Sequence, residues 1–199
     1  GSMPENIITY RKLTRADFQA TSVPDRLSKH KKKLNAHTAV TIRPAVGARY
    51  IITHGMIGDQ QIFHGRVDNL VFEAVMIPEQ SWWNPALNKK RRTYVLQHEQ
   101  IHFALMELEA KKLNQRVKED PHITYAYGNS ANEVRRELGE LIGQLLEESQ
   151  RLTLKSHTEF DEDTSMRHNP TAQQEWHDRI MAELKRLSGG EMVGSDSSL

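Results

Sequence analysis

Residues 85–117 read PALNKKRRTYVLQHEQIHFALMELEAKKLNQRV. Asn84 precedes Pro85, an arrangement typical of a helix cap followed by the first helical residue. No further proline or glycine interrupts the chain before Pro121. The sequence therefore predicts a long helix over roughly 85–117, against which the rest of the chain must pack.

The segment before this helix has an amino-acid pattern typical of strands rather than of a helix. Between residues 36 and 78, short β-branched and aromatic runs are separated by Gly, Asp and Pro, which is typical of strands joined by tight turns. The expected strands cover residues 37–42, 49–53, 61–64 and 70–77. We expect a small antiparallel sheet here.

Two further helices are expected after residue 130. Asn132 is a candidate cap for the first of them, whose apolar residues repeat at helical spacing: Leu138, Leu141, Ile142, Leu145 and Leu152. Asn169-Pro170 repeats the cap-plus-proline signal, and Gly189-Gly190 ends the pattern. We expect one α+β domain over 1–188, β-rich over 36–78 and helical over 84–188, with a disordered tail over 189–199.

Composition excludes several classes of function. The chain has 27 Lys and Arg against 26 Asp and Glu, so its net charge of +1 gives no global reason to expect nucleic-acid binding. It has no cysteine, which excludes thiolate metal sites and leaves His, Asp and Glu as ligands. No apolar run reaches the roughly 18–20 residues that span a bilayer, so no membrane span is expected.

A metal-binding motif lies inside the long helix. Residues 98–102 read His-Glu-Gln-Ile-His, with the two histidines four residues apart and a glutamate after the first. One helical turn brings both imidazoles to the same face, where they can bind one tetrahedral zinc ion. Glu99 lies about 100° around the helix from His98, so its carboxylate can reach a water that zinc makes acidic.

The surroundings of the motif are apolar. By helical spacing, only a narrow arc containing Gln97, Gln100 and Glu107 is expected to face solvent. A carboxylate within an apolar surface needs a metal ion or a proton partner, so the context favours a metal site. The alternative is that both histidines are hydrogen-bonded core residues and Glu99 forms a salt bridge.

Four stretches resemble a bacterial family, formerly a domain of unknown function, that is described as secreted zinc-dependent proteases. The likeness lies in residues 10–18 (YRKLTRADF), 81–83 (SWW), 96–103 (LQHEQIHF, followed by Glu107 and Ala110), and Phe160-Asp161 with Thr164, Gln173 and Trp176. It spans nearly the whole chain up to the last helix. The resemblance implies a zincin-like hydrolase acting on proteins or peptides and exported from the cell, hence secreted or periplasmic.

The third zinc ligand is open at this point. The family pattern has a histidine two residues after the threonine, where this chain has Met166, while His168 stands two residues later. Asp161 matches the pattern without adjustment and offers an oxygen ligand. Glu147 and Glu148 are further candidates, because a second antiparallel helix can deliver a glutamate to such a site.

Other polar and aromatic residues have less specific signals. His122, Tyr125 and Tyr127 could stabilise an oxyanion, but connecting loops are commonly polar. Trp82 and Trp83 could line a groove, although packing between sheet and helix is the more common role. Glu107 is expected on the far side of the helix from the histidines.

The sequence predicts a zinc metallopeptidase with His98 and His102 as ligands, His168 or Asp161 as the third, and Glu99 as base. One alternative is a zincin-like protein that binds metal without turnover. Another is an envelope-binding module that uses the basic runs 31–33 and 89–92.

Overall fold

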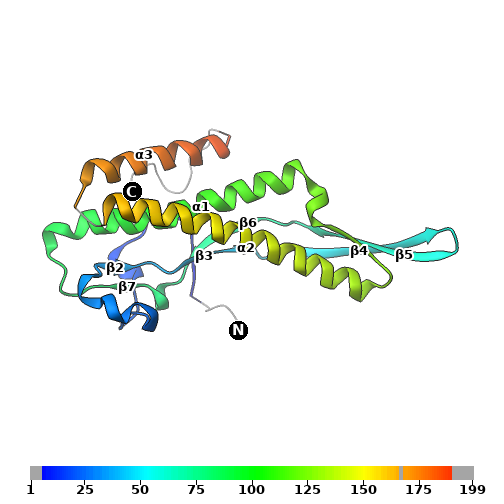
Figure 1. Ribbon diagram of the computed structural model, residues 1–199, viewed down its shortest axis with the longest axis horizontal. Helices are drawn as coiled ribbons and strands as arrows, with labels where there is room; N and C mark the ends of the chain where they lie inside the picture. Colours follow the sequence, from blue (N-terminus) through cyan, green and yellow to red (C-terminus); the bar gives the residue numbers. More distant parts are fainter. Residues whose placement is uncertain (1–5, 166–167, 190–199) are drawn as a thin grey trace.

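A computed structural model describes residues 6–165 and 168–189, leaving out the side chains of residues 30–33. Three helices form its frame: α1 (Arg92–Glu119), α2 (Ala131–Thr164) and α3 (Pro170–Leu187). Figure 1 shows α1 running lengthwise with α3 along one side and the strands along another. Small antiparallel sheets pack against these helices, which confirms the expected α+β class.

The strands form three antiparallel sheets rather than the one expected. The first sheet has the order β1 (Ile8–Thr9), β6 (Phe72–Met76), β3 (Val40–Pro44). The second pairs β2 (Ala36–His37) with β7 (Trp82–Trp83). The third has the order β4 (Arg49–Ile57), β5 (Gln60–Asp68), β8 (Tyr125–Gly128). The expected strand 37–42 is divided because the Ala39 N–H donates to Ser81 Oγ at 3.0 Å. β2 therefore pairs with β7, and β3 pairs with β6.

In the described part of the chain, 3-10 helices connect these elements. They are η1 (Arg15–Asp17), η2 (Asp25–Lys33), η3 (Pro78–Gln80), η4 (Lys89–Arg91) and η5 (Pro121–Thr124). The base of the long hairpin β4–β5 packs on the start of α2, and its tip extends beyond the helices at one end of the molecule (Figure 1).

The long helix begins later than expected. Asn84 Oδ1 accepts from the Ala86 N–H at 2.9 Å, but its Nδ2 donates to Leu34 O, so this residue holds a turn against the preceding segment. Asn88 is extended and its side chain accepts from the Lys90 N–H. The helical stretch therefore starts with η4 and continues as α1 from Arg92.

The second helix starts slightly earlier than expected. Ser130, and not Asn132, is its N-cap and accepts from the Glu133 N–H at 3.1 Å. Its far end continues to Thr164, so Asp161 is a helical residue. Leu152 is 49% exposed and does not belong to the buried stripe.

The third helix follows the prediction. Asn169 Oδ1 caps it by accepting from the Ala172 N–H at 3.1 Å, and Pro170 is its first residue. The chain after Gly189, where a disordered tail was expected, lies outside the described residues. None of the helices within 6–165 and 168–189 has the length and apolar character needed to cross a bilayer.

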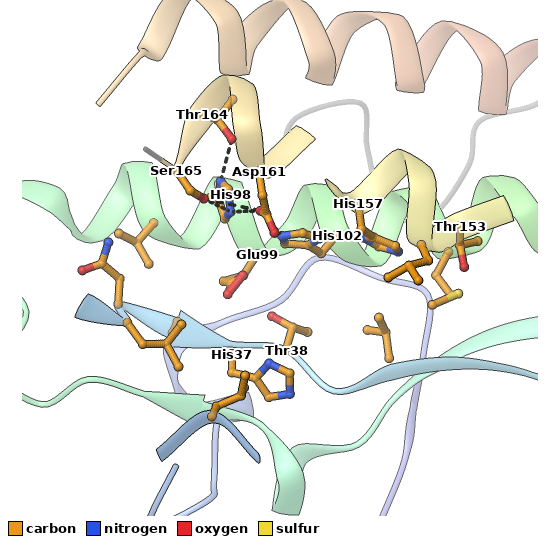
Figure 2. Close-up of a pocket in the computed structure, with 18 of the residues that line it drawn as sticks. His37, Thr38, His98, Glu99, His102, Thr153, His157, Asp161, Thr164 and Ser165 are labelled. Atoms are coloured by element: carbon orange, nitrogen blue, oxygen red, sulfur yellow. Dashed lines mark hydrogen bonds and ion pairs between the residues drawn. The ribbon is translucent and has the colours of Figure 1, made fainter. Parts of the chain in front are cut away.

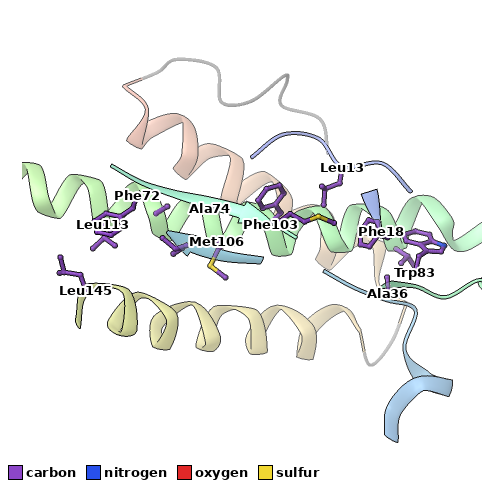
Figure 3. Packing of buried hydrophobic residues seen from close by; sticks show 14 residues of the cluster. Leu13, Phe18, Ala36, Phe72, Ala74, Trp83, Phe103, Met106, Leu113 and Leu145 are labelled. Atoms are coloured by element: carbon purple, nitrogen blue, oxygen red, sulfur yellow. The ribbon is translucent and has the colours of Figure 1, made fainter. Parts of the chain in front are cut away.

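The largest apolar cluster lies between α1, α2 and the β1–β6–β3 sheet (Figure 3). Trp82 and Trp83 are buried, as the packing interpretation predicted. Gln100, expected to face solvent, is 2% exposed because its side chain accepts from the Leu13 N–H and donates to Arg11 O. The N-terminal segment is thus bound directly beside the motif.

Candidate metal centre

Two helices bring titratable side chains together at one point. His98, Glu99 and His102 lie on consecutive turns of α1, and their ligand atoms lie within 4.8 Å of one another. α2 adds His157 and Asp161, which are also four residues apart and therefore share one face. Figure 2 shows these two faces meeting.

The Asp161 carboxylate lies between the two histidines of the motif. Its Oδ1 is 3.0 Å from His98 Nε2 and 2.9 Å from His102 Nε2. Ligand atoms on a tetrahedral zinc ion are separated by about 3.3–3.6 Å, given bonds of about 2.0–2.2 Å. Each nitrogen thus lies within a few tenths of an ångström of this spacing from the oxygen, and the three atoms, called the triangle below, have the chemistry that zinc accepts.

The electrostatics of this triangle favour a cation. Burial raises the pKa of Asp161, but hydrogen bonds and charges from His102 and His98 outweigh it and hold that pKa well below its usual range. Burial lowers the pKa of His102, but the hydrogen bond to Asp161 and the charges of Glu99 and Asp161 outweigh it and raise that pKa. Asp161 is therefore ionised, and positive charge at this position is stabilised.

Glu99 is buried beside the triangle, and one of its carboxylate oxygens has no hydrogen-bond partner among the described residues. It is 4% exposed, and its Oε2 forms no hydrogen bond with any residue that the structure describes. It lines a cavity of about 560 Å³ that also reaches His98, His102 and Asp161. A buried carboxylate oxygen is costly without a partner, so its presence here fits a metal ion and water in the cavity.

The Nδ1 nitrogen of His98, which does not face Asp161, is within hydrogen-bond distance of two side chains. Its Nδ1 lies 3.2 Å from Gln173 Oε1 and 3.2 Å from Thr164 Oγ1. Gln173 is fully buried, and its Nε2 donates to Tyr94 O and Gln97 Oε1, which fixes its amide orientation. His98 can therefore donate through Nδ1, while its Nε2 points to Asp161 Oδ1 and Ser165 Oγ, at 3.0 and 3.1 Å.

The sequence reasoning missed Ser165, whose Oγ lies 3.1 Å from His98 Nε2, and His157. The Nδ1 of His157 lies 2.7 Å from His102 Nδ1, and the two rings stack with centroids 4.9 Å apart. The available signal for His157 was its spacing of four residues from Asp161. That signal has meaning only if the second helix continues through Asp161 and packs this face against the motif.

The opposite wall of the cavity comes from the end of β2. His37 and Thr38 face Glu99 across the cavity (Figure 2). Burial, with the positive charges of Arg26 and His102, lowers the pKa of His37 to about 4, so this ring is neutral at pH 7. Thr38 is 8% exposed, and its Oγ1 also has no partner within the described part of the chain.

The two candidates for third ligand lie in different places. Asp161 is at the triangle, whereas the His168 ring packs against Tyr94 with centroids 4.3 Å apart. Glu148 pairs with Arg116 at 2.8 Å, and neither it nor Glu147 lines the cavity. The structure therefore brings Asp161, and not the other candidates, to the two histidines.

The remaining predicted residues lie away from the triangle. His122, Tyr125 and Tyr127 belong to η5 and β8 and do not line the cavity. Glu107 does not line it either, in agreement with its expected position on α1. Of the basic runs, Arg91 reaches the cavity, whereas the side chains of residues 31–33 lie outside the description.

Comparison of the chain with family models, with curated proteins and with solved structures found no match. The resemblance noted from the sequence therefore stays a prediction. Function is inferred here from the geometry and chemistry of the site itself.

Proposed function

We propose that this chain is a zinc-dependent peptidase-type hydrolase, with His98, His102 and Asp161 as zinc ligands and Glu99 as the general base. One observation carries the proposal. Two imidazole nitrogens lie 2.9–3.0 Å from one carboxylate oxygen, beside a buried carboxylate oxygen that has no partner in the part of the chain that the structure describes. Three protein ligands next to an open cavity are typical of catalytic zinc sites, whereas structural sites are closed by four.

Zinc, when bound, supplies a Lewis acid that polarises a carbonyl group and makes water more acidic. Glu99 takes one proton from the attacking water as the water oxygen bonds to the carbonyl carbon. The same carboxylate returns that proton to the nitrogen as the carbon–nitrogen bond breaks. Glu99 is 4% exposed, so its carboxylate has little contact with bulk water outside the cavity.

The cavity gives the substrate a defined place. Its volume of about 560 Å³ accommodates a few residues of a peptide, and its walls combine apolar and polar groups. His37 and Thr38 offer hydrogen-bonding groups on the side opposite the histidines. A protein or peptide substrate is therefore proposed, with secretion or periplasmic location as the setting that the family resemblance suggests.

The test compares the wild-type chain with Glu99→Gln, both loaded with zinc, on a fluorescence-quenched peptide library with cleavage read by mass spectrometry. Glu99→Gln keeps the side-chain shape and all proposed ligands but cannot accept a proton. We expect hydrolysis to fall by about 10²–10⁴-fold while zinc binding is retained.

Two outcomes would contradict the proposal. If Glu99→Gln hydrolyses peptides as fast as wild type, the assigned base is wrong. If wild type binds one zinc ion but cleaves nothing in the library, the chain is a metal-binding protein without turnover.

A further inference from the structure

Asp161 and His157 contact opposite edges of the same imidazole. On α2 they are one turn apart, so their side chains reach the same ring of α1. Asp161 Oδ1 lies 2.9 Å from His102 Nε2, and His157 Nδ1 lies 2.7 Å from His102 Nδ1 (Figure 2). Both nitrogens of His102 are therefore held by one helix.

When His102 binds a metal through Nε2, only one placement of protons on the ring nitrogens of His102 and His157 is possible. A hydrogen bond between two imidazole nitrogens needs one N–H and one lone pair. A ligating Nε2 carries no proton, so neutral His102 has its proton on Nδ1. His157 Nδ1 must then be the acceptor, and its own proton must be on Nε2.

The surroundings of His157 agree with this assignment. The His157 ring stacks with the His102 ring at an interplanar angle of 20°, which limits the rotation of both rings. His157 Nε2 is buried and has no partner among residues 6–165 and 168–189.

We propose that His157 is a positioning residue for the metal ligand His102. Its Nδ1 accepts the His102 Nδ1–H and thereby fixes the tautomer and ring orientation that direct Nε2 to the metal. The inference rests on the metal-binding part of the proposed function and is independent of hydrolysis. The two ligands then differ in their support, because His98 donates to an amide oxygen, that of Gln173.

Two variants of the full chain separate this role from simple packing. His157→Leu fills the space but removes the acceptor, whereas His157→Asn places an amide oxygen near the position of Nδ1. Zinc affinity is measured by competition with a chromophoric chelator at pH 7.5. We expect His157→Leu to bind zinc about 10–100-fold more weakly than wild type, and His157→Asn to recover most of the loss.

His54→Leu is the matched control, because His54 is exposed on β4 and does not line the cavity. It should bind zinc as wild type does. Equal zinc affinity of wild type and His157→Leu would overturn the inference, as would a failure of His157→Asn to exceed His157→Leu. Circular dichroism melting of each variant verifies that folded chains are compared.

A measurement on the wild-type chain avoids any folding defect. ¹⁵N NMR of the zinc-loaded protein should show His102 protonated at Nδ1 and His157 protonated at Nε2. Protonation of His157 at Nδ1 would overturn the inference even if zinc is bound. Absence of zinc binding by wild type would instead overturn the proposed function, and with it the need for a positioning residue.

Discussion

The interface between α1 and α2 has two regions of opposite character. Toward the start of α1, His98, Glu99 and His102 meet a face of α2 that carries His157 and Asp161. Further along α1, the contacts are apolar and belong to the cluster shown in Figure 3: Met106, Leu113, Leu145, Ile142 and Leu146. The same two helices therefore hold a polar region and an apolar region side by side.

This difference separates stability from function within one interface. The apolar region removes side chains from water, which stabilises the packed helices. The polar region buries Glu99 Oε2 and His157 Nε2 without partners in the described chain, which destabilises the fold. Groups of that kind are expected where a ligand completes them. Substitutions in the polar region should thus mainly change zinc binding, whereas substitutions in the apolar region should mainly change the free energy of unfolding.

The largest effect is expected from removing a proposed ligand. His102→Ala or Asp161→Ala should weaken zinc binding by more than about 100-fold, because loss of a ligand exceeds the 10–100-fold effect of losing an outer partner. Isothermal titration calorimetry with zinc provides the measurement. Retention of wild-type affinity in either variant would contradict the ligand assignment.

In the apolar region, we expect a substitution to lower stability and leave zinc affinity unchanged. Leu113 is 3% exposed in the core cluster, so Leu113→Ala should lower the free energy of unfolding by about 2–5 kcal/mol. Urea denaturation measures this loss. Zinc affinity of the folded variant should stay at the wild-type value, and a parallel loss of affinity would show that the two regions are not separable.

Glu107 lies on the same helix as the proposed ligands but outside the cavity, and we expect it to make the stability of the fold depend on pH. Burial raises the pKa of Glu107 to about 7, with Lys111 lowering it and Glu73 raising it. For an acid whose folded pKa is raised, ionisation opposes folding, so stability is lost as pH rises from about 4.5 through about 7. Glu107→Gln should therefore stabilise the chain by roughly 1–3 kcal/mol at pH 8 and hardly at all at pH 4. Equal effects at both pH values would exclude this account of Glu107.

The smallest effect is expected on the opposite wall of the cavity. His37→Leu removes one hydrogen-bonding group that faces Glu99, so peptide hydrolysis should fall by about 2–10-fold. Zinc affinity should not change, because His37 is not a proposed ligand. Steady-state kinetics on a cleaved peptide measures the first quantity, and unchanged rates would remove His37 from the substrate site.

Helical periodicity predicted more of the fold than of the site. The uninterrupted run ending near Val117 and the Asn169-Pro170 signal identified two helices, because capping and periodicity are local properties. The start of α1 was wrong because Asn84 and Asn88 are both good caps, and only the contact of Asn84 with Leu34 decides between them. The division of the strands into three sheets depends similarly on a distant contact, that of Ser81 with Ala39.

The α1 part of the site is local in sequence, and the α2 part is not. His98, Glu99 and His102 were identifiable because one turn of helix brings them together. The choice between Asp161 and His168 depends on where α2 ends, and His157 has no signal until that helix is known to pass through it. Long-range packing therefore determines the residues that complete and support the proposed zinc site.

The ligand set can be read directly from a crystal of the zinc-loaded chain. An anomalous difference map at the zinc absorption edge locates the ion without assumptions about its ligands. We predict one strong peak between α1 and α2, about 2.0–2.2 Å from His98 Nε2, His102 Nε2 and an oxygen of Asp161. A peak bonded to His168 in place of Asp161, or no peak at the two histidines, would contradict the account.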